Sequence, residues 1–176
     1  MSSQQFDSAD AARYHEAITR LLELKSNEVV GNSRPENATS LITEFFRHAR
    51  ERVVLYLPKV PASVFDNEKL RYHMTLAARR NVSIEAICGP EPEAEEFFED
   101  LLQLSTEYRV EVSQMPADFE PPCGEASFVL MDAGSYRFQE KEETPAVACM
   151  NNPKLVEKLH YIFFKTQKKI RDSQGE

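Results

Sequence analysis

Apolar residues recur along the chain with two different periods, and the period separates helices from strands. Repeats at three- and four-residue intervals place apolar side chains on one helical face, as Leu41, Phe45 and Ala49 do. This spacing predicts five helices, over residues 10–25, 36–50, 66–80 and 90–108 and from Asn152 to about residue 170. The last has Asn152 as N-cap and Pro153 in its first turn.

Short apolar runs between these segments predict strands. Residues 52–58, "RVVLYLP", form a continuous apolar run that ends at proline, which is typical of a strand buried on both faces. Alternating or apolar runs predict five more strands, over residues 82–89, 109–116, 126–133, 135–140 and 145–150. Residues 26–37, "SNEVVGNSRPEN", break every period with Gly, Pro and Asn and are interpreted as a linker.

The order of the elements predicts the fold class. After two leading helices the order is β-α-β-α-β-β-β-α, and β-α-β units imply parallel strands joined by right-handed crossovers. The later strands imply a hairpin. We therefore expect an α/β domain with a mixed, mostly parallel central sheet flanked by helices. The expected division is an N-terminal helix and linker at 1–34, the α/β domain at 35–171 and a disordered tail at 172–176.

Length and charge narrow the class of protein. A chain of 176 residues has the length of a single domain with its own core, and it has no apolar run long enough to span a membrane. No basic-then-apolar signal pattern opens it, so a cytoplasmic location is expected. The net charge of −8 disfavours a general phosphate-binding surface, although Arg79, Arg80 and the basic segment 165–171 leave local binding of nucleic acid open.

Cysteine and histidine give no clear reactive site. Cys88 and Cys149 lie in apolar runs and are expected to be buried thiols, and no Cys or His pair has the spacing of a zinc site. We expect no metal and no cofactor. The four histidines fall on the predicted helices, where packed or surface positions are the favoured interpretation: His15, His48, His73 and His160.

Residues 125–153, "EASFVLMDAGSYRFQEKEETPAVACMNNP", follow the order strand, Asp, turn, strand, strand and helix. This order, with an amphipathic helix before "RVVLYLP", resembles one half of a phospholipase D superfamily enzyme over residues 36–170. The resemblance implies a strand carrying His-x-Lys-x-x-x-x-Asp and a following strand ending in Gly-Ser-x-Asn before a helix. In that family the His attacks phosphorus, Lys and Asn hold the phosphoryl oxygens, and the Asp supports the structure around the His.

The motif is degenerate here. If Asp132 takes the Asp position, Glu125 stands at the His position and Ser127 at the Lys position. Near the predicted helix start, Ala148, Cys149 and Asn151 stand at the positions of Gly, Ser and Asn, so only Asp132 and Asn151 match. A carboxylate in place of the nucleophile repels a phosphodiester, and the stabilising cation is gone. These four positions, Glu125, Ser127, Asp132 and Asn151, are expected to line one groove.

Three functional hypotheses follow. The favoured one is a noncatalytic binding, regulatory or structural module. The resemblance implies that it pairs as a homodimer, because single-half members of the family do so; the alternative partner is another protein. The second is a phosphodiesterase or nuclease with chemistry rebuilt on Cys149, His73 or Glu125. The third is a nucleic-acid-binding accessory protein. Candidate binding residues also include Tyr136 and Arg137, either as an exposed recognition edge or as a half-buried strand with alternating faces.

Overall fold

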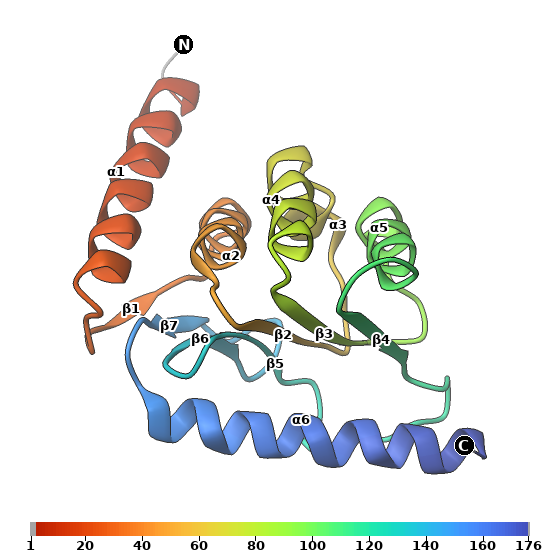
Figure 1. Ribbon diagram of the computed structural model, residues 1–176. Coiled ribbons are helices and arrows are strands. Elements are labelled where there is room, and N and C mark those ends of the chain that lie inside the picture. Colours follow the sequence, from red (N-terminus) through yellow and green to blue (C-terminus); the bar gives the residue numbers. More distant parts are fainter. Residues whose placement is uncertain (1–2, 176) are drawn as a thin grey trace.

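The computed structural model describes residues 3–175, with side chains from residue 10 onward (Figure 1). Within this range the chain forms six helices and one seven-stranded sheet. The elements are α1 (Ser3–Glu23), β1 (Val29–Gly31), α2 (Pro35–His48), β2 (Arg52–Leu57), α3 (Ala62–Phe65), α4 (Glu68–Arg79), β3 (Ser83–Cys88), α5 (Glu95–Ser105), β4 (Val110–Gln114), β5 (Ser127–Met131), β6 (Ser135–Gln139), β7 (Val147–Cys149) and α6 (Pro153–Gln174).

The sheet is mixed, as predicted, but most of its pairs are antiparallel. The strand order is β1-β7-β6-β5-β2-β3-β4, and only β2–β3 and β3–β4 are parallel. The other four pairs are antiparallel, which corrects the expectation of a mostly parallel sheet. The reason is the loop over residues 115–126, which returns the chain so that β5 lies antiparallel beside β2. Each later strand then adds antiparallel to its neighbour.

The segment expected to be a linker contains an edge strand. β1 pairs with β7 in the register Val29↔Cys149 and Gly31↔Val147. A strand of three residues that ends in Gly carries no periodic signal, and β7 supplies the hydrogen-bonding partners that hold it extended. The linker interpretation is therefore wrong for Val29–Gly31.

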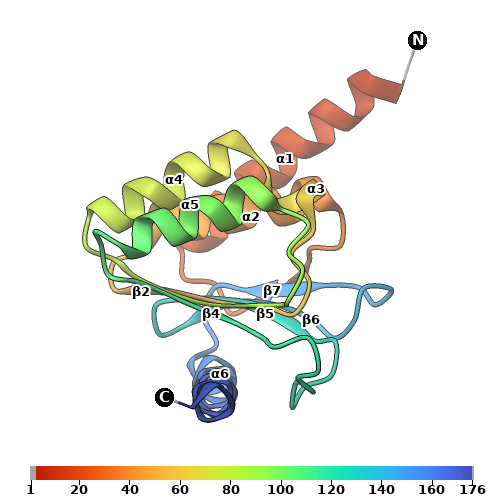
Figure 2. The ribbon, with the colours of Figure 1, turned by 90° about the vertical axis from the view of Figure 1, so that its right-hand side faces the viewer.

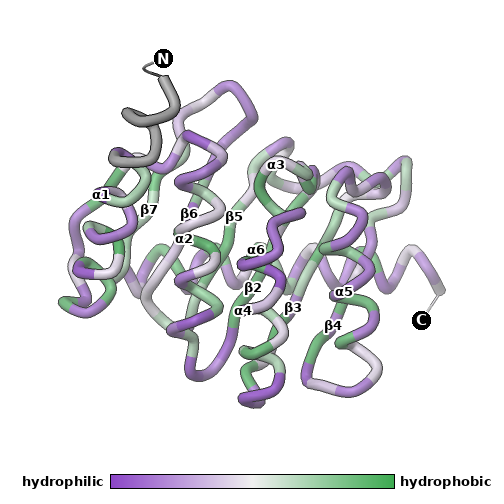
Figure 3. The backbone as a smooth tube through the Cα atoms, turned by 90° about the horizontal axis from the view of Figure 1, so that it is seen from above, coloured by the Kyte–Doolittle hydropathy of each residue, from purple (hydrophilic) through white to green (hydrophobic). Residues whose placement is uncertain are grey.

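Helices cover both faces of the sheet in unequal numbers (Figures 1 and 2). α2, α4 and α5 pack on one face and α6 lies alone along the other. β2 is buried between the layers as predicted, with Val53 and Leu55 in the larger cluster and Val54 and Tyr56 in the α6 cluster. Hydrophobic and hydrophilic residues alternate along the helical turns in Figure 3, as expected for helices with one buried face each.

Two helices begin at asparagine caps. The Asn152 side chain accepts the N–H of Leu155 at 3.1 Å, which confirms the cap predicted for α6. Asn67 caps α4 in the same way, one residue after the predicted start at Asp66. α6 continues to Gln174, so residues 172–174, assigned above to a disordered tail, are helical, whereas residue 176 lies outside the described residues. Over residues 3–175, none of the helices has the length and apolar character of a membrane span.

Candidate ligand-binding site

The four degenerate motif positions lie at two opposite ends of the sheet. β5 begins at Ser127 and ends at Met131, so Glu125 and Ser127 lie where β2 ends, and Asp132 lies where β2 begins. Asn151 shares a pocket with Asp132. Five residue steps of extended chain place Asp132 about 16 Å from Ser127. The expectation that all four line one groove is therefore wrong.

Asp132 holds the entrance to β2 in place. Its carboxylate accepts the backbone N–H groups of Arg50 at 3.2 Å, Glu51 at 2.9 Å and Arg52 at 3.1 Å. The residue has a left-handed backbone with φ of 51°, a conformation that Asp tolerates better than most residues. A carboxylate with three backbone donors has little capacity left for a ligand, and Asp132 supports the entrance to β2 and not the structure around the His position, which lies at the opposite end of β5.

The pocket beside Asp132 has a volume of about 350 Å³. The turn before β6 is fastened to the start of α6 here, because Ser135 Oγ donates to the carbonyl of Met150 at 2.9 Å and the N–H of Asn152 donates to that of Gly134 at 2.7 Å. Asn151 is exposed at the rim. Lys25 and Arg50 are cationic residues that line the pocket, and His48 lines it too.

Tyr136 and Arg137 lie on opposite faces of β6, and both are buried. Tyr136 packs in the α6 cluster, where burial raises the pKa of its phenol. Arg137 is only 8% exposed and points toward the layer of α1 and α2. The exposed-edge interpretation is therefore wrong, and that of a strand with alternating faces is right.

Arg137 is held by neutral groups alone. Its Nε donates to Asn32 Oδ1 at 2.6 Å, and its Nη2 donates to the Asn32 carbonyl and to Gln139 Oε1, both at 3.3 Å. It forms no ion pair with any carboxylate of the described residues. Burial lowers the pKa of the guanidinium to about 10, so it stays charged at neutral pH.

The register of β5 and β6 places Gln139 beside Ser127 and Arg137 at the middle of its strand. Ser127 pairs with Gln139, and Val129 pairs with Arg137, so Ser127 and Arg137 are diagonal neighbours on one face. The strand beside β5 is thus β6, and residues 148–151 do not face Ser127. At the rim, Lys59 Nζ lies 3.0 Å from Glu142, and this contact, with Glu125 nearby, raises the pKa of Lys59.

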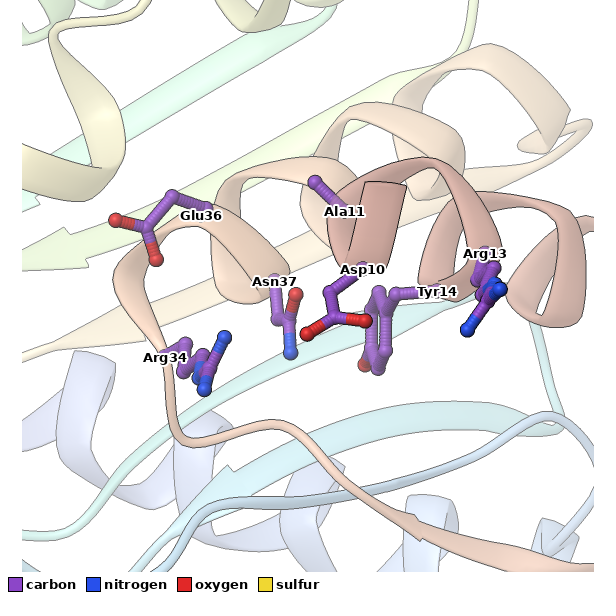
Figure 4. Close-up of a pocket in the computed structure, with 7 residues that line it drawn as sticks. All are labelled: Asp10, Ala11, Arg13, Tyr14, Arg34, Glu36 and Asn37. Carbon is purple, nitrogen blue, oxygen red and sulfur yellow. The ribbon is translucent and has the colours of Figure 1, made fainter. Parts of the chain in front are cut away.

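A second pocket, of about 660 Å³, opens between α1 and the start of α2 (Figure 4). Asn32, which is fully buried, donates from its side chain to the hydroxyl of Tyr14 and to the carbonyl of Asn37 at 2.9 Å. Tyr14 and Asn37 line this pocket, so the hydrogen bonds of Arg137 extend to its wall. The sequence gives no signal for Asn32 and Gln139, because single amides in a presumed loop and at a strand end form no pattern.

No family model matches this chain, and no curated protein does. Among solved structures, the archaeal chromatin protein TrmBL2 matches with a TM-score of 0.61 at 14% identity, over 94% of this chain and 63% of that chain. Nuc, a phospholipase D family member from Salmonella typhimurium, and NucT from Helicobacter pylori both match with a TM-score of 0.56, at 14% and 10% identity, over 80% of this chain and 94% of theirs. This chain has a phospholipase D-like fold. At these identities the likeness shows the fold alone.

The phospholipase D-like strand end lacks an imidazole within the described residues. His15 and His48 instead flank Glu44, with His48 Nε2 at 3.1 Å and His15 Nε2 at 3.8 Å from its carboxylate. His73 lies on α4 and His160 on α6, where burial lowers the pKa of each. These helical positions agree with the sequence interpretation.

The surroundings of the cysteine thiols do not favour reactivity either. Cys88 and Cys149 are buried, as expected, and burial raises the pKa of Cys88 to about 12. The Cys149 thiol faces the carbonyl of Ser26 at 3.9 Å. No group of three or more His, Cys, Asp or Glu residues that could hold a metal occurs among the described residues.

Arg79 and Arg80 do not form a joint basic patch on the phospholipase D-like domain. Arg80 Nη2 donates to the carbonyl of Phe46 at 2.8 Å and so caps the end of α2. Arg79 is exposed on α4 and lines a shallow pocket with Asp100 and Glu107. One arginine is occupied by a structural contact and the other has acidic neighbours.

Proposed function

We propose that this protein is a noncatalytic binding module on a phospholipase D-like fold. The observation that supports this proposal is the composition of the strand end, where Glu125 and Ser127 stand at the His and Lys positions of the motif. A phosphoryl-transfer site needs a nucleophile and preorganised positive donors, and loss of one such donor typically costs about 10²–10³ in rate. The buried cation of the neighbouring strand β6, Arg137, lies at mid-strand and is held by amide groups.

A phosphodiesterase assay tests the proposal. Turnover of bis(p-nitrophenyl) phosphate by the full chain should equal that of a variant carrying Glu125→Ala and Ser127→Ala. The exposed Glu99→Ala, on α5, serves as a control for the change in charge. Turnover that the double substitution abolishes and Glu99→Ala preserves would show an enzyme with rebuilt chemistry.

Pairing with a second copy belongs to the same proposal. The resemblance implies this pairing, because single-half members of the family form homodimers in which the motif stretches of the two copies face each other. Size-exclusion chromatography with light scattering should give about twice the chain mass of 20.2 kDa. A mass of one chain across the accessible concentration range would contradict pairing.

Nucleic-acid binding is a second candidate, and α6 favours it. Four exposed lysines follow one side of this helix together with Tyr161, whose ring lies 4.9 Å from Lys165 Nζ. These lysines, 154, 158, 165 and 168, extend over about 21 Å at the rise of an α-helix. The similarity of fold to TrmBL2, whose structure is described as showing a novel mode of DNA binding, adds support. The net charge of −8 opposes it.

Salt dependence distinguishes this candidate. If α6 contacts phosphates, the substitutions Lys158→Gln and Lys165→Gln together should lower the slope of log K against log salt by about two for duplex DNA, measured by fluorescence anisotropy. Lys69→Gln and Arg79→Gln remove the same charge from α4 and should leave the slope unchanged. Equal slopes for both double variants would exclude α6 as the contact surface.

A further inference from the structure

The pocket beside Asp132 lies at the opposite end of β5 from Glu125 and Ser127. Its lining comes from the end of α1, the end of α2 with the turn to β2, the β5–β6 turn and the start of α6. The volume of about 350 Å³ falls at the lower end of the range of roughly 300–1,000 Å³ in which proteins bind small molecules. The size of the pocket therefore suits a small molecule.

The buried part of the pocket wall is apolar. Leu22, Met131 and Met150 line it and are only 9%, 8% and 4% exposed. Methionine side chains are unbranched and polarisable, so they adapt their packing to irregular apolar and aromatic groups. An anion without a carbon body would leave this wall uncovered. A ligand that fills the pocket therefore needs an apolar part.

Two cationic residues at the rim of the pocket lack a counterion. Lys25 and Arg50 are both exposed, and neither forms an ion pair with a carboxylate of the described residues. Lys59, Arg71 and Arg171, by contrast, each pair with a glutamate. The free ammonium and guanidinium groups are donors that an anionic ligand can accept.

The backbone of Lys25 adds to this observation. Its φ of 47° is left-handed, and the residue follows the last turn of α1, where its N–H donates to the carbonyl of Leu22 at 3.2 Å. Glycine is the usual residue at such a helix end, because a side chain there strains the backbone. A lysine at this position places a cation beside the pocket in spite of that strain.

The charges of the lining favour a ligand with one negative charge. Asp132 is the sole carboxylate among the described residues that line the pocket, and three backbone N–H groups occupy it. Lys25, Arg50 and Asp132 together leave one net positive charge. His48 is held in one orientation by Glu44, which lies 3.1 Å from its Nε2.

We propose that this pocket binds a small monocarboxylate with an aliphatic or aromatic body. Lys25 and Arg50 bind the carboxylate, and Leu22, Met131 and Met150 surround the body. The planar guanidinium of arginine matches the two oxygens of a carboxylate. The inference rests on the proposed binding function and names its ligand class. The residues assigned to the ligand lie outside the degenerate motif.

Binding of simple carboxylates to the full chain tests this inference. The probes are sodium hexanoate and sodium benzoate, with acetate and 1-hexanol as controls, at constant ionic strength. Calorimetry should show saturable binding of at least one of the two larger acids, and the amide NMR signals of Lys25, Arg50 and Gly134 should shift. Acetate lacks the apolar body and 1-hexanol lacks the charge, so each should bind at least about tenfold more weakly.

Two variants locate the binding site. Lys25→Gln and Arg50→Gln each remove one exposed charge, and Arg50→Gln keeps the backbone N–H that donates to Asp132, so both variants should fold. Each should weaken binding of the carboxylate by about three- to tenfold. Arg79→Gln removes an exposed positive charge on α4 and should leave binding unchanged.

Three results would overturn the inference: neither larger acid saturates, 1-hexanol binds as tightly as hexanoate, or both glutamine variants bind as the wild type does. Absence of carboxylate binding together with absence of phosphodiesterase turnover would reject this ligand class alone. Turnover would reject the noncatalytic function itself.

Discussion

At the scale of single residues, the same side-chain chemistry serves different purposes according to its partners. Asp132 matches the degenerate motif, and its carboxylate is occupied by three backbone N–H groups at the entrance to β2. Arg137 does not belong to the motif, yet it is a buried cation in the middle of β6, next to the strand that carries the motif. Match to a motif therefore identified a structural residue.

The Asp132 contact predicts a graded effect on stability. Asp132→Asn keeps one acceptor and a residue type that tolerates positive φ, whereas Asp132→Ala loses both. We expect Asp132→Ala to lower the free energy of unfolding by about 2–3 kcal/mol, and Asp132→Asn by about half of that, in urea titrations. Equal losses for the two variants would contradict the role of the carboxylate in accepting these bonds.

The pKa of His160 predicts a dependence of stability on pH. Burial lowers its pKa below the usual 6.5, so the folded protein takes up this proton at a lower pH than the unfolded chain. The contribution of the neutral His160 imidazole to the free energy of unfolding is fully present above the pKa that His160 has in the unfolded chain. This contribution is lost as the pH falls below about 6.5. Free energies of unfolding between about pH 7.5 and 5.5 should fall less steeply for His160→Gln than for the wild type; parallel curves would argue against this origin.

At the scale of elements, local signals placed most helices and strands, and tertiary contacts set their ends. The apolar stripe of α2 and the two-sided burial of β2 follow from periodicity. Asp66, predicted to begin a helix, instead accepts the N–H of Phe97 near the start of α5 at 3.0 Å. Asn67 is the actual cap of α4. Only the tertiary structure brings Asp66 to α5, because 31 residues separate them along the chain.

Two adjacent asparagines at the start of α6 offer a matched test of capping. Asn152 accepts the N–H of Leu155, whereas Asn151 is exposed. Asn152→Ala should lower the free energy of unfolding by about 1 kcal/mol, and Asn151→Ala should change it by less than about 0.5 kcal/mol. Thermal and urea unfolding both report this difference, and the reverse ranking would show that the cap is misassigned.

At the scale of the whole molecule, the sheet has three principal helices on one face and α6 alone on the other (Figure 2). α6 is therefore the main source of apolar cover for Tyr56, Phe128 and Tyr136. Its neighbouring phenylalanines differ sharply, since Phe163 is 0% exposed and Phe164 is 50% exposed. The packing of α6 against the sheet therefore depends on Phe163.

This difference predicts unequal losses. Phe163→Ala should lower the free energy of unfolding by about 3–5 kcal/mol, because it leaves a cavity between α6 and the sheet. Phe164→Ala removes a side chain that is half in water and should cost less than about 1 kcal/mol. Urea titrations of both variants measure the contrast; similar losses would mean that α6 does not form the second layer as described.

The sequence by itself determined the five long helices, every strand except β1 and the mixed α/β class of fold, because apolar periodicity is set by local geometry: 3.6 residues per helical turn and two per strand repeat. It also determined that the His and Lys of the resembled motif are replaced by Glu125 and Ser127. The tertiary structure alone decided the antiparallel place of β5, the pairing of β1 with β7, and the separation of Asp132 from Ser127.

Arg137 and Asn32 show the physical reason most clearly. They lie 105 positions apart in the sequence, yet their side chains share a hydrogen bond of 2.6 Å. Such contacts depend on strand order and register, which are fixed by the packing of the whole sheet and leave no local pattern in the chain.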